Sequence, residues 1–181
     1  MSKELEAKQA VVGRMIPIGI GLTVAVIGVL YWIVPPLRGV ETQVDRLVVA
    51  LRCAGVAALP LLAGIHAIAS QRGKSEAIDP LAGAGTESRA LQVHIRYTQN
   101  TLEQLVLFVI VLLALSTYLD GVSIRLLPVL TGAFIVGRVL FWDGYLIHPL
   151  YRSPGVVFGF LINGLSLIYI LYRTLRLVFE G

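Results

Sequence analysis

Three polar residues that could bind a ligand stand at the start of a long apolar segment: Arg96, Asn100 and Glu103. On a helix, which turns about 100° per residue, they lie within roughly 60° of one another, and residues 105–115 that follow are apolar. Arg offers forked donors to carboxylates, and Asn offers an amide donor and acceptor. Ionisable groups in a membrane helix usually face a bundle interior or a wet cavity. The stripe predicts a site for an anionic, peptide-like ligand or, alternatively, an interhelical polar network that fixes packing.

The composition indicates an integral membrane protein. Of 181 residues, 56% are hydrophobic and 14% are charged, whereas soluble domains have about 25% charged residues. The net charge of +4 comes from Lys and Arg placed mostly at the ends of apolar segments, which fits anionic lipid headgroups and topology signals rather than nucleic acid. Cys53 is the single cysteine, so no internal disulfide can form. No set of His, Cys, Asp and Glu has metal-ligand spacing, so no metal is expected.

Five apolar spans can be drawn, and they predict an all-α membrane bundle of five transmembrane helices: residues 15–34, 45–70, 87–118, 124–147 and 154–178. Residues 1–14 are expected to form an N-terminal tail, 15–43 an extra transmembrane helix with its connection, and 44–181 a four-helix domain. Residues 71–86, rich in Gly, predict a surface loop. Pro60 and Pro128 predict kinks or helix ends.

An odd number of spans brings the start of the third, the end of the fourth and the start of the fifth to the N-terminal side of the membrane. At 1.5 Å per residue, Glu103 lies roughly 16 Å below the start of its helix and Arg138 roughly 14 Å below the end of the next. This matched depth predicts a buried ion pair between them. Slightly more Lys and Arg on this side favour a cytoplasmic N-terminus.

Two motifs in this order resemble the MAPEG family, the membrane-associated proteins of eicosanoid and glutathione metabolism. The first is the R-x-x-x-N-x-x-E pattern of Arg96, Asn100 and Glu103, and the second is Arg138 with Tyr145 seven residues on, followed by Arg152-Ser153. The resemblance implies a four-helix protomer, a homotrimer, and glutathione held between protomers. The additional first helix resembles that of mattrin-like and prokaryotic members.

The resemblance also implies roles for individual residues. Arg152, with Ser153 beside it, would be the catalytic pair that activates the thiol. Arg138 would be the structural partner of Glu103. The residues expected to contact glutathione are Arg96, Asn100, Glu103, Gln99, Tyr145 and Arg72.

The resulting function is a membrane-bound, glutathione-dependent transferase or peroxidase acting on lipophilic electrophiles from the bilayer. One alternative is a non-catalytic relative that binds lipid or a partner, because some family positions differ, Phe141 standing for a Tyr or His. A third is a small proton-coupled transporter using Glu103. The expected partners are a second and third copy, membrane lipids and a lipophilic small molecule. The expected location is a prokaryotic cell membrane, or otherwise the endoplasmic reticulum.

Overall fold

The computed structural model describes residues 3–74, 79 and 87–180, apart from the side chains of residues 7 and 180, and every regular element in that part of the chain is helical. The elements are α1 (Lys3–Ile33), α2 (Gln43–Ala57), α3 (Leu59–Arg72), α4 (Arg89–Tyr118), the short 3-10 helix η2 (Gly121–Arg125), α5 (Leu126–Ile147) and α6 (Ser153–Glu180). They make five segments long and apolar enough to cross a membrane, with α2 and α3 forming one segment and η2 and α5 another. The predicted all-α membrane bundle is confirmed.

Two predicted boundaries differ from the structure. The second span is interrupted at Ala58, because Pro60 in the first turn of α3 lacks an N–H and cannot continue α2. Residues 3–14 are not a separate tail but begin α1, where a Lys8–Glu4 ion pair of 2.7 Å supports the first turns. Most of the predicted loop 71–86 lies outside the described residues.

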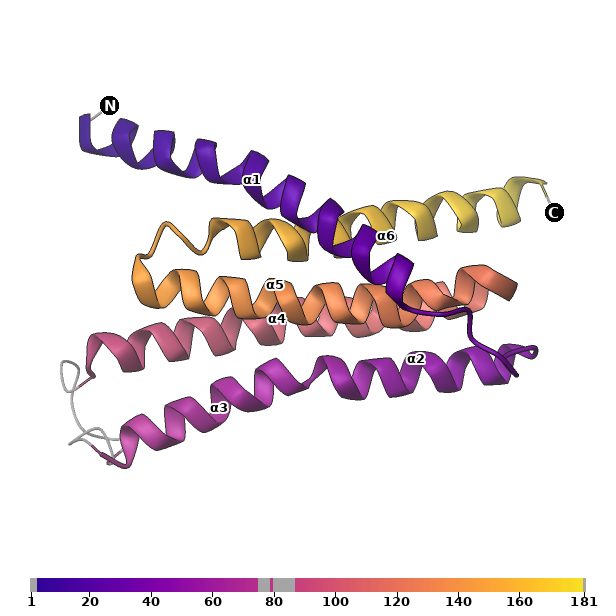
Figure 1. Cartoon of the computed structure of the whole chain (residues 1–181), viewed down its shortest axis with the longest axis horizontal. Coiled ribbons are helices and arrows are strands. Elements are labelled where there is room, and N and C mark those ends of the chain that lie inside the picture. Colours follow the sequence, from indigo (N-terminus) through magenta and orange to yellow (C-terminus); the bar gives the residue numbers. More distant parts are fainter. Residues whose placement is uncertain (1–2, 75–78, 80–86, 181) are drawn as a thin grey trace.

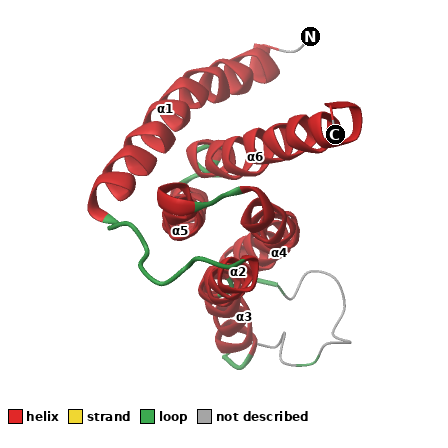
Figure 2. Cartoon of the chain, turned by 90° about the vertical axis from the view of Figure 1, so that its right-hand side faces the viewer, coloured by secondary structure: helices red, strands yellow, loops and turns green. Residues whose placement is uncertain are grey.

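The five spans form a flattened bundle with the two termini at opposite ends (Figure 1). Helix α1 packs on α6 and α5 at one side of the bundle, and α2 and α3 pack on α4 at the other. Viewed along the helices, α5, α6 and α4 therefore lie between α1 and the α2–α3 segment (Figure 2). The start of α4, the end of α5 and the start of α6 meet at one end of the bundle, as the odd number of spans predicts.

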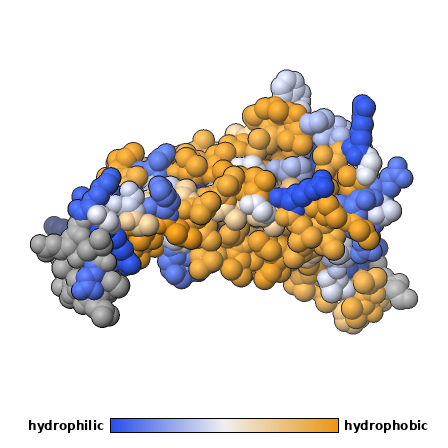
Figure 3. Space-filling model, turned by 90° about the horizontal axis from the view of Figure 1, so that it is seen from below, coloured by the Kyte–Doolittle hydropathy of each residue, from blue (hydrophilic) through white to orange (hydrophobic). Residues whose placement is uncertain are grey.

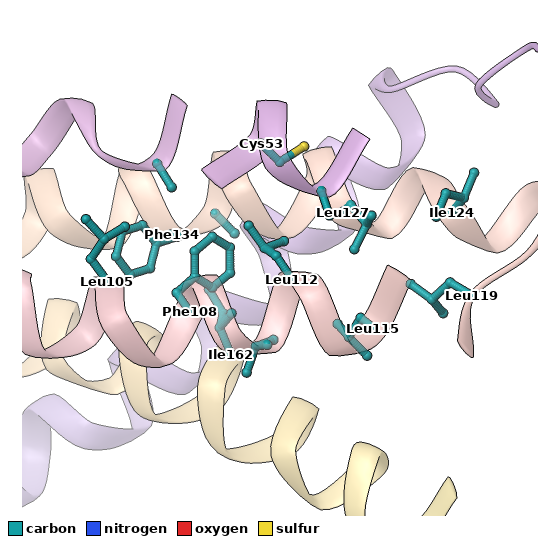
Figure 4. Close-up of a cluster of buried hydrophobic side chains, with 14 of the residues drawn as sticks. Cys53, Leu105, Phe108, Leu112, Leu115, Leu119, Ile124, Leu127, Phe134 and Ile162 are labelled. Atoms are coloured by element: carbon teal, nitrogen blue, oxygen red, sulfur yellow. The ribbon is translucent and has the colours of Figure 1, made fainter. Parts of the chain in front are cut away.

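The main apolar core lies between α2, α4, α5 and α6, towards the end that holds η2 (Figure 4). Phe108 and Phe134 stack there with ring centroids 4.5 Å apart, and both are buried. Cys53 is buried in the same core, 8% exposed. Apolar side chains also cover the middle of the visible surface, with polar ones near the two ends (Figure 3). This distribution suits a bundle surrounded by lipid.

A capping box fixes the start of α2. The Thr42 hydroxyl accepts a hydrogen bond from Asp45 N–H at 3.1 Å, and Thr42 N–H donates to Asp45 Oδ2 at 2.9 Å. We expect Thr42→Ala to lower the free energy of unfolding by about 1 kcal/mol, because helix N–H groups lose their acceptor. Thermal unfolding in detergent micelles measures this loss. Thr42→Ser keeps the hydroxyl and should lose less; an equal loss would mean that the cap is not the cause.

Candidate functional site

A buried arginine joins three helices near the predicted site. Arg138 on α5 is 1% exposed, and its Nη1 donates to Asn100 Oδ1 on α4 at 2.9 Å. Its Nη2 donates to the carbonyl oxygen of Gly155 on α6, also at 2.9 Å. The rings of Phe141 and Phe134 lie 5.1 and 5.7 Å from the guanidinium carbon. Arg138 therefore fixes the positions of α4, α5 and α6 relative to one another.

The structure replaces the predicted Glu103–Arg138 ion pair with a neutral partner. Glu103 is exposed and accepts a hydrogen bond from Gln99 Nε2 at 3.0 Å, one turn earlier on α4. Asn100, which is half-buried, points its amide oxygen at Arg138 instead. The depth of Glu103 was predicted to match that of Arg138, but Asn100 is the member of the stripe that faces α5, and Glu103, roughly 60° further around α4, is exposed. Asn100, expected as a ligand contact, is thus a structural partner of Arg138 through that oxygen.

The turn between α5 and α6 places the predicted catalytic pair beside Tyr145. The guanidinium carbon of Arg152 lies 4.9 Å from the centre of the Tyr145 ring, and Arg152 is exposed while Tyr145 is buried. The Ser153 hydroxyl donates to the carbonyl oxygen of Leu150 at 2.8 Å. Arg152, Tyr145 and Ser153 are therefore brought together as the sequence predicts, with the hydroxyl engaged in holding the turn.

A groove runs from Arg152 and Ser153 between α1 and α6, with a volume of about 460 Å³. Its other lining residues are all apolar: Val12, Ile16, Ile20, Pro149, Leu150, Val156, Val157, Phe160 and Leu161. The two helices approach closely beside it at Gly19, where a Cβ would lie 2.9 Å from Val157 Cβ and 3.0 Å from Pro154 Cα. Sequence reasoning missed the α1 wall. The signal for it is the i, i+4, i+8 spacing of Val12, Ile16 and Ile20, which predicts one apolar face of a helix. The spacing does not say which other helix that face packs against.

The remaining predicted residues divide between two sides of the bundle. Arg96 precedes Asn100 by four residues, and Arg152 precedes Gly155 by three, so both lie about one turn nearer the end of the bundle than Arg138. Arg96 and Gln99 are exposed on α4. Arg72 ends α3, which packs on α4 and α5, whereas α6 lies nearer α1. Within one chain, Arg72 is therefore on the side away from the groove.

An aromatic cluster supports the same end of α4 and α5. Trp142 stacks on Tyr97 with ring centroids 4.3 Å apart, and its Nε1 donates to His94 Nδ1 at 3.0 Å. Tyr97 donates from its hydroxyl to the carbonyl oxygen of Pro60 at 3.2 Å. Trp142 is half-buried and packs between α4 and α5. The cluster stiffens the helices that carry Arg138 and Tyr145.

Comparison with known proteins agrees with this architecture. The model of the MAPEG family matches residues 49–172. The chain belongs to the MAPEG family. Helix α1 lies before the matched residues, so it is an addition to the part of the chain that defines the family. The predicted membership of this membrane protein family is thereby confirmed.

Similar MAPEG relatives include Transmembrane protein 79 from two mammals. The chain is 30% identical to the Mus musculus protein over 131 residues, which are 72% of this chain and 33% of the relative. It is 30% identical to the Bos taurus protein over 120 residues, 66% of this chain and 30% of the relative. The chain thus matches about a third of the length of these relatives. No solved structure matches it.

Proposed function

We propose that this MAPEG protein is a glutathione-dependent transferase or peroxidase that acts on lipophilic electrophiles from the bilayer. The observation that carries the proposal is the position of Arg152 at an apolar groove of about 460 Å³. A cation beside an apolar groove can stabilise an anionic nucleophile while the groove holds an apolar substrate. Membership of the family supports the choice of glutathione.

The exposed donors of α4, together with Arg152 at the groove, suit a ligand with the chemistry of glutathione, which has two carboxylates and a thiol. Arg96 and Arg152 are exposed, and neither forms an ion pair with a carboxylate in the described part of the chain. Their guanidinium groups can each take a carboxylate or a thiolate. Gln99 and Glu103 on the exposed face of α4 would bind the amide and amino groups, and Tyr145 would add a hydroxyl. When bound, glutathione supplies the sulfur nucleophile.

Four residues at this end of the bundle then have distinct roles in the proposed reaction. Arg152 places a positive charge where the thiol would ionise, and nearby positive charge favours the thiolate. Tyr145 stacks under this guanidinium and limits its conformations. Ser153 is assigned as a positioning residue, since its hydroxyl holds the carbonyl oxygen of Leu150. Arg138 keeps α4 and α6 at the spacing that the site needs.

A homotrimer is part of the proposal because of Arg72. This residue lies away from the groove within one chain, and a second copy could bring its α3 end to the exposed face of α4. The same face continues as an apolar stripe in the membrane, formed by Leu102, Val106, Leu107 and Ile110. Such a stripe can pack against a helix of a neighbouring copy.

The test is conjugation of glutathione to 1-chloro-2,4-dinitrobenzene, and reduction of a lipid hydroperoxide, by purified protein in lipid nanodiscs. We expect a rate that saturates with glutathione. Ile16→Trp should fill the groove and raise the KM for the lipophilic substrate several-fold, with little change in the KM for glutathione, because Ile16 lines only the apolar wall.

Ile18→Trp is the matched control, because Ile18 is exposed on α1 and does not line the groove. Equal effects of the two tryptophans would contradict the assignment of the groove. The absence of both turnover and calorimetric heat with glutathione would favour the alternative, a non-catalytic protein that binds lipid or a partner. The engagement of Asn100 with Arg138 is the observation in favour of that alternative.

A further inference from the structure

A cluster of tyrosine and arginine side chains lies at the end of the bundle opposite to Arg152. Tyr118 ends α4, and Tyr169, Tyr172, Arg173 and Arg176 follow one another along the last turns of α6. We propose that this tyrosine–arginine cluster is a binding site for one anionic membrane phospholipid, with the headgroup on the arginines and an acyl chain in the neighbouring apolar cavity.

The polar half of the site is built around Arg173. Its Nη1 donates to the Tyr169 hydroxyl at 2.8 Å, and its guanidinium carbon lies 5.3 Å from the Tyr118 ring centre and 5.8 Å from the Tyr169 ring centre. The Tyr118 hydroxyl is linked to Thr174 Oγ1 at 2.9 Å. These contacts hold the guanidinium in place with one N–H used by Tyr169. An arginine held in this way keeps further N–H donors for phosphate oxygens.

Arg176 extends the basic surface by one turn. Its Nη1 lies 3.5 Å from the Tyr172 hydroxyl, and its guanidinium carbon is 6.0 Å from that ring. A polar cavity of about 680 Å³ joins these groups, lined by Thr117, Tyr118, Tyr169, Tyr172, Arg173, Arg176 and Leu177. Two guanidinium groups and several hydroxyls facing one cavity suit a phosphate diester.

An apolar cavity of about 470 Å³ adjoins the polar one and shares Tyr118, Tyr169 and Arg173 with it. It continues between α4, α5 and α6 along Leu115, Leu126, Leu130 and Leu165. Asp120 and Ser123 also line it. The Asp120 carboxylate would repel an anionic group, so the headgroup belongs on the side of Arg176 and the acyl chain on the leucine side.

The position and chemistry favour a phospholipid over a soluble anion. The cluster lies at the end of two membrane spans, the level at which tyrosines meet headgroups. A soluble phosphate has no apolar part that could fill the apolar cavity. An acyl chain can fill it and pack against the leucine side chains of α4, α5 and α6. The site is independent of the proposed function, because it lies at the other end of the bundle from Arg152.

The experiment compares lipid retention by the full chain and its variants. The protein is placed in mixed phosphatidylcholine and phosphatidylglycerol nanodiscs, and bound lipids are counted by native mass spectrometry. We expect one retained phosphatidylglycerol, bound about fivefold more weakly for each arginine lost in R173Q/R176Q. The control R38Q/R89Q removes the same charge from exposed positions outside the cluster and should retain the lipid.

A second variant tests the acyl half without touching the arginines. Leu165→Trp narrows the apolar cavity and should weaken retention of phosphatidylglycerol, leaving the thermal unfolding midpoint near that of the parent chain. Unchanged retention in Leu165→Trp would overturn the acyl site, and unchanged retention in R173Q/R176Q would overturn the headgroup site. Displacement of the lipid by glycerol phosphate at similar concentration would show a phosphate site rather than a lipid site.

Discussion

Replacing Arg152 by alanine is expected to lower the rate of thiol transfer by about 10- to 100-fold at neutral pH. A neighbouring cation lowers the pKa of an acidic group such as a thiol by about one to three. The thiolate is the reactive form, so a lower pKa raises the reactive fraction at neutral pH. Arg152 is the cation that lies at the groove, stacked on Tyr145. Steady-state rates with 1-chloro-2,4-dinitrobenzene at saturating glutathione measure the loss.

The pH profile separates this role from a structural one. Without Arg152 the thiol would ionise at higher pH, so the loss should be large near pH 6–7 and shrink towards pH 9. Arg152→Lys keeps a cation and should restore part of the rate. Arg89→Ala, an exposed charge at the same end of the bundle, should have no effect. A rate for Arg152→Ala equal to that of the parent chain would show the proposed mechanism to be wrong.

Gly155→Ala is expected to reduce the free energy of unfolding by about 3 kcal/mol. An added Cβ would contact the Phe141 backbone nitrogen and lie 2.5 Å from Phe141 Cα and 2.6 Å from the Gly137 carbonyl oxygen. Backbone cannot move aside as a flexible side chain can, so α5 and α6 must separate, at the cost of overpacking and a weakened Arg138–Gly155 hydrogen bond. Thermal unfolding in micelles reports the change.

Gly164→Ala is the matched control on the same helix. A Cβ there would meet nothing within 4 Å, and alanine favours a helix over glycine by roughly 0.5–1 kcal/mol. We therefore expect the control to be neutral or slightly stabilised. Destabilisation of both variants to the same extent would mean that the loss of glycine itself, and not the α5–α6 contact, is responsible.

The sequence predicts the spans well because the membrane imposes a strong and local signal. Apolar runs of the required length set the five crossings, and Pro60 marks the interruption between α2 and α3. The predicted start of the first helix is wrong by a dozen residues. Charged residues such as Glu4 and Lys8 occur both in polar tails and in helices that extend beyond the lipid, so they do not mark where α1 begins. Local signals give the type of an element more reliably than its end.

The arrangement of the candidate residues was predicted in part, and the errors have a geometric cause. Arg152 and Tyr145 meet as expected because only a short turn separates their helices. The partner of Arg138 was wrong because rise along a helix gives depth, whereas the choice between Asn100 and Glu103 depends on how α4 is rotated against α5. The part of the groove that α1 lines could not be predicted, because residue periodicity does not show which helices pack against one another.

The close approach at Gly19 has a consequence for the shape of the groove. Helix α1 crosses α6 obliquely, and the two helices diverge towards the N-terminus of α1 (Figure 1). The angle at which the helices cross sets the width of the groove that leads to Arg152. A larger residue at position 19 would push α1 away from α6, so the width of the groove depends on a helix that lies before the residues matched by the family.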